Sequence, residues 1–308
     1  MKTIALFFGG LSNESEISIL SAKNVVKSFD YQKQRLILLY WHKKDGQFYR
    51  VKDIENLAVN KKNIVPIEKF KSIFEVALLM THGRYGEDGV LQAILESQSI
   101  RYCGCRVLSS ALCMDKAAFK DLLRTTKIKQ TKYIVLDFQK ETKQELAIKQ
   151  KNIQRNLRLP LYVKPANSGS SVGITKVEKL ADLTKALKLA RKHDTKVVVE
   201  EGLVKPREIE VAVLGNKKML ISRPGELHLA KDFYDYDDKY TRGESSVVIP
   251  ARLSTAQEKI IKNLAHQAYK LFDCQGFARI DFFIAKNKIY LNEINTLPGF
   301  TDIPCFRS

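Results

Sequence analysis

The sequences ARIDFF at residues 278–283 and NEIN at residues 292–295 decide how this chain is classified. Both come from segments in which apolar residues alternate with polar ones, a pattern typical of strands that bury one face. We expect one strand over residues 277–285 and a second over residues 288–294, separated by a short polar turn. The end of the chain is therefore predicted to form an antiparallel hairpin.

The polar side chains of this hairpin carry the predicted chemistry. Successive side chains of a strand point to opposite faces, so Asp281 shares a face with Arg279. Glu293 likewise shares a face with Asn295, and Asn292 is expected to point the other way. Oxygen donors at Asp281, Glu293 and Asn295 suit Mg²⁺, which also keeps water and phosphate ligands. The alternative is a plain polar face, in which two acids opposite each other would repel.

The bulk composition is that of a soluble globular protein. Its 308 residues exceed what one hydrophobic core usually holds, which predicts two or three packed subdomains. No apolar run approaches the roughly 18 residues of a membrane span, so no membrane contact is expected. The five cysteines include no CxxC pair, which favours reduced thiols in a cytoplasmic protein over disulfides or zinc.

The net charge of +18 raises the question of a nucleic-acid partner. The lysines are scattered, with only a mild concentration over residues 127–158, and no arginine-rich tract alternates with aromatic residues. Solvated faces and a polyphosphate site account for the excess charge. We expect no nucleic-acid partner. A basic nucleic-acid binder stays as an alternative hypothesis, and it would show steeply salt-dependent binding.

Strands alternate with helices upstream of the hairpin, which predicts an α/β or mixed α+β fold. The predicted strands span residues 3–9, 35–41, 75–81, 132–138, 160–165, 174–177, 196–203 and 208–214, and the predicted helices span residues 16–29, 89–97, 116–126, 140–156, 179–193 and 254–273. Residues 231–250 contain few helix signals and are predicted to form a long loop. Such a loop inside a compact domain is usually functional.

The segment ANSGSSVG at residues 166–173 is rich in serine and glycine and follows the predicted strand that carries Lys164. Gly169 and Gly173 permit close approach of the backbone, and successive N–H groups can hold phosphate oxygens. Lys164 lies on an otherwise apolar strand, where a buried ammonium needs an anionic partner. The segment is therefore a candidate phosphate-binding loop; the alternative is a hairpin loop that binds nothing.

Two further loops, GGLSNESE at residues 9–16 and THGRYGEDG at residues 81–89, follow predicted strands. Each leads from the carboxyl end of a strand into a helix, which is where open parallel sheets form their sites. Glu14 and His82 are the candidate functional groups. From the residues alone, a helix-capping acid and a hydrogen-bonded loop histidine remain open alternatives.

In combination these segments resemble the D-alanine–D-alanine ligases, through nearly the whole chain and in that family's order. The matching elements are GGLSNESEIS at 9–18, THGRYGEDGVLQ at 81–92, MDK at 114–116, YVKPANSGSSVG at 162–173, VVVEEGL at 197–203, FYDYDDKY at 233–240, ARIDFF at 278–283 and NEINTLPGFT at 292–301. Their joint order and spacing carry the resemblance.

The resemblance implies an ATP-grasp fold. An N-terminal Rossmann-like domain would span residues 1–112, a central subdomain residues 113–203 and a C-terminal subdomain residues 204–308. ATP would lie between the last two, with Mg²⁺ or Mn²⁺ at the hairpin. The residues implied to bind ATP are Lys116, Lys164, Ser171, Glu200, Glu201, Leu203, Glu208 and Lys239, and those implied to bind the metal are Asp281, Glu293 and Asn295.

The implied reaction joins two D-alanines through an acyl phosphate, giving D-alanyl-D-alanine for peptidoglycan in the cytoplasm. The implied catalytic residues are Glu14, Ser170, Tyr240, Arg279 and Gly299. Glu14 would hold the ammonium of the first D-alanine, and His82 would bind near its carboxylate. Arg279 and the backbone N–H of Gly299 would stabilise the tetrahedral oxyanion. The family also leads us to expect a homodimer.

The sequence departs from the family's pattern at DIPC, residues 302–305. There the family usually has a serine and a leucine that bind the carboxylate of the second substrate. Pro304 cannot donate a backbone hydrogen bond, and Asp302 adds negative charge. The chain stops at Ser308, so we expect it to lack the family's terminal helix. Two alternatives follow: a catalytically impaired ATP-binding relative, and a D-alanyl-D-lactate-type ligase, against which Tyr240 argues because it follows the dipeptide-forming pattern.

Overall fold

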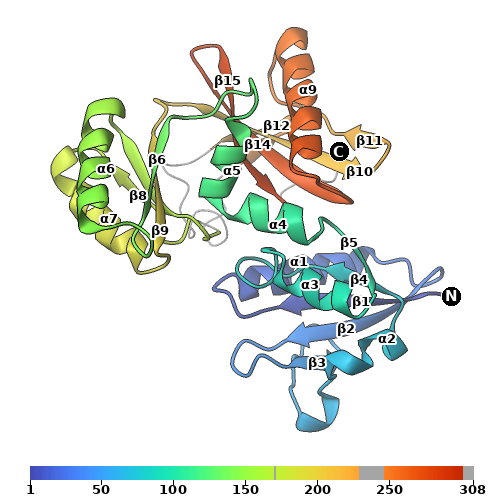
Figure 1. The fold of residues 1–308 in the computed structure, drawn as a ribbon. Coiled ribbons are helices and arrows are strands. Elements are labelled where there is room, and N and C mark those ends of the chain that lie inside the picture. The colour runs from blue at the N-terminus through green and yellow to red at the C-terminus, as the bar shows by residue number, and fades with distance from the viewer. Residues whose placement is uncertain (170, 229–245, 301–308) are drawn as a thin grey trace.

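The computed structural model of the chain describes residues 1–169, 171–228 and 246–300. Its strands form three separate sheets, and helices surround them, as Figure 1 shows. Helices α4 (Val107–Met114) and α5 (Lys116–Leu123) lie in the middle of the molecule, between the N-terminal sheet and the other two. The predicted mixed α/β architecture is confirmed.

The N-terminal sheet has the strand order β3-β2-β1-β4-β5. Its elements are β1 (Thr3–Gly9), α1 (Ser15–Ser28), β2 (Arg35–Trp41), β3 (Phe48–Val51), the 3-10 turns η1 (Lys61–Asn63) and η2 (Ile67–Lys69), α2 (Phe70–Ile73), β4 (Val76–Leu79), α3 (Val90–Ser97) and β5 (Arg101–Cys103). Phe7 of β1 packs edge-on against Phe48, Phe70 and Phe74 at the centre of the core. Because β1 and β4 pair in parallel, the loops that follow them emerge at the same edge of the sheet.

The central sheet is antiparallel, in the order β6-β9-β7-β8. Its elements are β6 (Tyr133–Asp137), α6 (Lys143–Asn156), β7 (Leu161–Pro165), β8 (Thr175–Val177), η3 (Leu180–Asp182), α7 (Leu183–Arg191) and β9 (Lys196–Glu201). Thr142 and Glu145 form a capping box that starts α6. The sheet buries Leu161, Val163 and Val199 beneath its helices. The segment at residues 166–173 leaves this sheet between β7 and β8.

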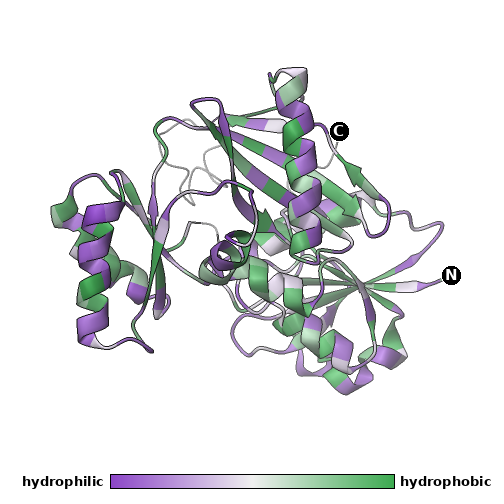
Figure 2. Ribbon diagram, turned by 45° about the horizontal axis from the view of Figure 1, so that its top comes forward, coloured by the Kyte–Doolittle hydropathy of each residue, from purple (hydrophilic) through white to green (hydrophobic). Residues whose placement is uncertain are grey.

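The C-terminal sheet runs β13-β12-β10-β14-β15, with β11 paired to β10. Its elements are β10 (Arg207–Gly215), β11 (Met219–Ile221), β12 (Gly225–His228), β13 (Ser246–Val248), α9 (Thr255–Leu271), β14 (Phe277–Ala285) and β15 (Lys288–Asn295). Ser254 caps α9 through a capping box with Gln257. Figure 2 shows hydrophobic and hydrophilic residues alternating along α9, as expected for a helix with one buried face. The predicted terminal hairpin is present as β14 and β15.

The structure corrects several predicted elements. Strands β3, β5, β11, β12 and β13 and helix α4 were not predicted from the sequence. Strand β13 contradicts the predicted loop over residues 231–250, because the short run Ser246–Val248 pairs with β12. Residues 229–245 and 301–308, which include most of that loop and the altered tail, lie outside the described residues. Within the described ranges, no helix is long and apolar enough to cross a membrane.

Candidate active site between three sheets

A cavity of about 770 Å³ opens between the three sheets and is lined by residues from each of them. All predicted site residues that the structure describes line it: Glu14, His82, Lys116, Lys164, Ser171, Glu200, Glu201, Leu203, Glu208, Arg279, Asp281, Glu293, Asn295 and Gly299. The other three, Ser170, Lys239 and Tyr240, lie outside the described residues. Segments far apart in the sequence therefore converge on one space.

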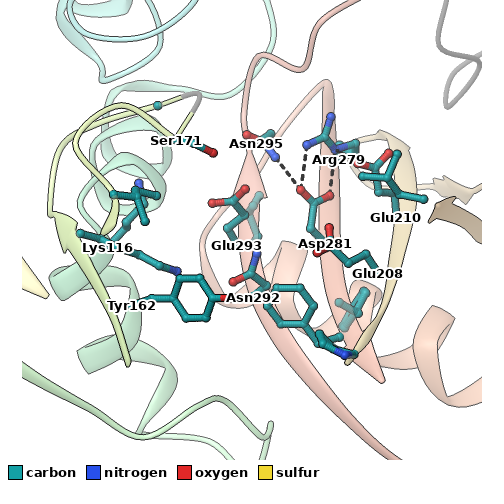
Figure 3. A pocket seen from close by; sticks show the side chains of 18 of the residues that line it. Lys116, Tyr162, Ser171, Glu208, Glu210, Arg279, Asp281, Asn292, Glu293 and Asn295 are labelled. Carbon is teal, nitrogen blue, oxygen red and sulfur yellow. Dashed lines mark hydrogen bonds and ion pairs between the residues drawn. The ribbon is translucent and has the colours of Figure 1, made fainter. Parts of the chain in front are cut away.

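One side of the cavity carries an acid wall, which we define as Glu210, Asp281, Glu293 and Asn295 with Arg279 among them (Figure 3). Arg279 donates two hydrogen bonds of 2.8 Å to the carboxylate of Asp281. Asn295 Nδ2 donates a third to the same carboxylate at 2.9 Å. Arg279 Nε also lies 3.5 Å from Glu210, and Glu293 pairs directly with Asp281 across the hairpin. The guanidinium of Arg279 is thus shared between Asp281 and Glu210, and a third acid, Glu293, lies beside Asp281.

The acid wall holds more negative charge than its arginine balances. The pKa of Asp281 is raised to about 6; burial is the main cause, Arg279 opposes it, and Glu210 and Glu293 add to it. Within the described ranges, no three His, Cys, Asp or Glu side chains are arranged to hold a metal by themselves. The predicted metal ligands Asp281, Glu293 and Asn295 are not such a group, because one of the three is the amide of Asn295. Their oxygen donors and surplus negative charge fit Mg²⁺, which takes further ligands from water and phosphate.

A β-bulge in the hairpin corrects the predicted direction of Asn292. The register shifts between Asp281 and Phe282, so that Phe282 pairs with Leu291 and Asn292 is the extra residue. Asn292 therefore lines the cavity beside Glu293 instead of pointing away from it. The simple alternation of side chains used for the sequence prediction fails at this bulge.

The other side of the cavity carries a lysine wall, which we define as Lys116, Lys164 and Glu200 with Lys120 behind them. The Glu200 carboxylate lies 3.2 Å from Lys164 Nζ and 3.3 Å from Lys120 Nζ. Burial alone would raise the pKa of Glu200, but Lys120 and Lys164 lower it to about 2. Burial lowers the pKa of Lys116 and of Lys120. Two lysines, Lys120 and Lys164, thus pair with one buried carboxylate.

The serine- and glycine-rich segment is tied to the start of α5. Lys116 Nζ donates to the carbonyl oxygen of Ser168 at 2.5 Å. The backbone N–H of Lys116 donates to the carbonyl oxygen of Ala166 at 3.0 Å. Ser171 and Gly173 have positive φ angles of 61° and 75°. These contacts hold the segment against the lysine wall, with Ser171 facing the cavity.

Glu14 is held between two loops. It is 8% exposed, and its backbone N–H donates to Ser12 Oγ at 3.0 Å. A Cβ added at Gly83 or at Gly169 would overlap the Glu14 carboxylate. Both positions therefore need glycine if this carboxylate is to reach the cavity between the N-terminal and central sheets.

His82 joins the N-terminal sheet to the loop after β15. Its Nδ1 lies 3.0 Å from the carbonyl oxygen of Leu297, and its Nε2 lies 2.9 Å from Ser21 Oγ. Ser21 Oγ also accepts the backbone N–H of Phe300 at 3.2 Å. The loop that carries Gly299 is thus seated on α1 through a buried histidine.

His82 is held in its neutral form. Burial lowers the pKa of His82 to about 4, the carbonyl of Leu297 opposes this, and Arg279 contributes to it. Neutral histidine donates one hydrogen and accepts one, which fits the carbonyl at Nδ1 and the hydroxyl at Nε2. The ring is therefore a fixed bridge in this structure.

Comparison with known proteins assigns this geometry to a family. The model for the D-ala D-ala ligase N-terminus matches residues 3–105, and the model for the D-ala D-ala ligase C-terminus matches residues 122–308. The chain belongs to the D-alanine–D-alanine ligase family. It has that family's ATP-grasp fold.

Individual relatives agree with the family assignment. A D-alanine--D-alanine ligase from Caldicellulosiruptor bescii is 40% identical, over 98% of this chain and 88% of the relative. One from Clostridium acetobutylicum is 40% identical, over 99% of this chain and 91% of the relative. Among solved structures, the VanG D-Ala:D-Ser ligase from Enterococcus faecalis superposes with a TM-score of 0.84 at 36% identity, covering 97% of this chain and 91% of its own. The D-alanine-D-alanine ligase from Coxiella burnetii superposes with a TM-score of 0.80 at 32% identity, covering 98% of this chain and 88% of its own.

The remaining predicted residues of this D-alanine–D-alanine ligase family member also line the cavity. Leu203 follows β9, and Glu208 lies on β10 opposite Phe283 of β14. The Glu201 carboxylate accepts the backbone N–H of Arg158 at 3.1 Å. Glu201 thus lines the cavity while its carboxylate holds the turn before β7.

Sequence reasoning missed Glu87, Lys120 and the acid-wall residue Glu210. Glu210 was missed although it lies two residues after the predicted Glu208 on the same strand. Glu87 lines the cavity, and its pKa is raised well above the ordinary value by burial first, then by Glu14. It lay within the quoted motif THGRYGEDG, so the motif itself was the signal. Lys120 lies behind the lysine wall. Its signal was a second lysine four residues after Lys116, which is one turn along the same helix.

Proposed function

We propose that this chain uses ATP to join two D-alanine molecules into D-alanyl-D-alanine for peptidoglycan. The observation that carries the proposal is the cavity with a lysine wall on one side and an acid wall on the other. A polyphosphate bound with a divalent cation supplies the two kinds of charge that these walls lack. The names of the relatives support D-alanine as the substrate.

The first step is transfer of the γ-phosphoryl group to the carboxylate of the first D-alanine. A carboxylate is a poor electrophile, and the acyl phosphate gives it a good leaving group. Lys116 and Lys164 hold phosphate oxygens and offset the developing charge, and the family resemblance adds Lys239 to this role. Asp281, Glu293 and Asn295 would hold Mg²⁺ or Mn²⁺, which would offset negative charge on the phosphates.

In the second step the neutral amine of the second D-alanine attacks the carbonyl carbon of the acyl phosphate. The new C–N bond forms, the bond from that carbon to the phosphate oxygen breaks, inorganic phosphate leaves, and the nitrogen gives up a proton to solvent. Glu14 holds the ammonium of the first D-alanine, and the loop seated by His82 brings the backbone N–H of Gly299 to the reacting carbonyl. Arg279 lies beside the same space and stabilises the tetrahedral oxyanion. The family resemblance assigns catalytic roles to Ser170 and Tyr240 as well, and exclusion of water from the site would protect the acyl phosphate.

The organisation of the chain is part of the proposal. We assign substrate binding to residues 1–112 and ATP binding to residues 113–203 and 204–308. Separate sheets within each of these ranges support the division. We further propose a homodimer that acts in the cytoplasm, where ATP is available, without a nucleic-acid or membrane partner.

An assay of the full chain with ATP, Mg²⁺ and D-alanine tests the function. We expect ADP and phosphate to be released only when D-alanine is present, with dipeptide detected by mass spectrometry. ATP turnover without dipeptide would contradict the proposal. Parallel reactions with D-serine and D-lactate as second substrates distinguish D-alanyl-D-alanine formation from two related activities. One of these, D-Ala:D-Ser ligation, is the activity in the name of a similar solved structure. We expect D-alanine to be preferred.

A further inference from the structure

Lys120 is a buried lysine in the site for which the proposed reaction has no role. Its side chain is 2% exposed, and it lies on α5 four residues after Lys116. Lys120 Nζ lies 3.3 Å from Glu200 Oε2 and donates to Thr131 Oγ1 at 3.1 Å. Thr131 Oγ1 in turn donates to the same carboxylate oxygen at 2.9 Å. Lys120, Thr131 and Glu200 therefore form a closed, buried triangle.

The two oxygens of Glu200 divide its charge between two lysines. Lys164 Nζ lies 3.2 Å from Oε1, whereas Lys120 Nζ lies 3.3 Å from Oε2. Lys164 and Glu200 line the cavity, while Lys120 is not among the described residues that do so. Lys120 instead borders a separate small cavity behind the wall. It can therefore influence a ligand only through Glu200 and its neighbours.

We propose that Lys120 is a positioning residue for nucleotide binding, which neutralises Glu200 from behind and so leaves Lys164 available to phosphate. This inference rests on the ATP binding proposed above. A buried carboxylate binds the nearest cation strongly, because charges interact more in the interior than in water. With two lysines on one carboxylate, the cluster keeps a surplus positive charge directed at the cavity.

Removal of Lys120 changes this balance. Of its two lysine partners, Glu200 would then keep only Lys164, and the ammonium of Lys164 would have to neutralise the whole carboxylate charge instead of a phosphate oxygen. ATP would have to displace that ion pair in order to bind. The loss would fall on ATP affinity, because the ion pair of Lys120 is with Glu200 of the lysine wall.

A double-mutant cycle between Lys120 and Glu200 tests the inference in the full-length protein. We expect K120M to raise the KM for ATP about tenfold, with kcat changed by less than about twofold. In the E200Q background the same substitution should raise KM by less than about twofold, because the carboxylate that captures Lys164 is no longer charged. K120Q, which keeps a donor for Thr131 but lacks the charge, is expected to behave as K120M does. Direct ATP binding by calorimetry should give the same pattern.

Lys262→Met is the matched control. Lys262 forms an i,i+4 ion pair with Glu258 on α9, away from the cavity, so its loss should leave the KM for ATP unchanged. Equal KM values for wild type, K120M and K120Q overturn the inference while leaving the proposed function in place. Equal effects of K120M in both backgrounds also overturn it, since they would mark a structural role. Absence of ATP binding by the wild type overturns the proposed function, and the inference with it.

Discussion

The lysine wall and the acid wall face the same cavity but reach their charge imbalance differently. In the lysine wall, Lys120 and Lys164 pair with the single carboxylate of Glu200, and Lys116 adds a third ammonium group. In the acid wall, one guanidinium is shared by neighbouring carboxylates on a single antiparallel sheet. Each wall is electrostatically incomplete by itself.

The difference between the walls is also visible in how their groups titrate. The pKa of Asp281 rises to about 6 through burial and like charges, so the acid wall resists ionisation. In the lysine wall, the pKa of Glu200 falls to about 2 despite burial, because its cations outweigh the burial cost. The acid wall is therefore the side that gains most from an added cation, and the lysine wall is suited to anions. Substitutions in the two walls should consequently damage different steps.

The largest effect is expected in the acid wall, from Asp281→Asn. This change removes a carboxylate from the proposed metal site and from its pair with Arg279. We expect kcat to fall on the order of 10³-fold, because charge that develops during phosphoryl transfer is no longer offset. Steady-state kinetics with coupled ADP detection gives the measurement.

Asp273→Asn provides the control for that substitution. Asp273 is exposed in the turn after α9 and has a φ of 51°, a conformation that asparagine adopts readily. Its loss should leave kcat unchanged. A D281N enzyme with wild-type kcat would remove the acid wall from the chemistry.

The next largest effect is expected in the lysine wall, from Lys164→Met. Lys164 is the lysine of the Glu200 pair that lines the cavity. Its removal leaves Glu200 paired with Lys120, so the fold should persist. We expect the KM for ATP to rise about a hundredfold, a loss of about 3 kcal/mol in binding. Calorimetric titration with ATP checks this; unchanged ATP affinity beside a reduced kcat would contradict the division of roles between the walls.

The acid wall was predictable from the sequence because its chief residues lie on two neighbouring strands. Asp281 and Glu293 are separated by one short turn, so pairing and alternation bring them together. Asn292 was misplaced because a bulge breaks the alternation, and no residue type in NEIN signals that bulge. Local patterns therefore predicted the wall's members but not its exact lining.

The lysine wall was not predictable in the same way. Lys116, Lys164 and Glu200 come from α5, β7 and β9, and only tertiary packing brings them together. The apolar strand around it pointed to Lys164, and the family resemblance supplied Lys116. Lys120 was missed because burial cannot be read from a lysine on a helix. The short strands β11, β12 and β13 escaped for a related reason, since runs of three or four residues carry little periodicity.

A third effect, smaller than the two above, is expected where the walls meet the N-terminal sheet, from Gly169→Ala. The added Cβ would overlap the Glu14 carboxylate, and Gly169 is not among the residues with positive φ, so the backbone itself should accept alanine. We expect the KM for D-alanine to rise about thirtyfold while ATP affinity stays the same. Substrate-saturation kinetics would reveal the change. Gly225→Ala, whose Cβ meets Ile249 Cγ1 at 3.1 Å, is the control and should alter neither constant.

The smallest effect concerns His82, which bridges the sheets without adding charge to either wall. Its pKa is lowered from 6.5 to about 4, so the unfolded chain takes up a proton at a higher pH than the folded protein does. Stability therefore falls as pH drops through 6.5 toward 4. Between about pH 7 and about pH 5.5 the expected loss from this residue is about 1 kcal/mol.

His82→Asn removes that titration but keeps a polar group at the bridge. We expect urea unfolding to show that H82N is less stable than the wild type at neutral pH, because two buried hydrogen bonds are disturbed. We also expect the stability of H82N to fall less steeply toward acid pH than that of the wild type. His266→Asn, on α9 and away from the cavity, should reproduce the wild-type decline. Parallel pH profiles for wild type and H82N would mean that His82 accepts a proton in the folded state. The loop carrying Gly299 would then rest on a charged bridge, and the acid wall would have a second cation beside Arg279.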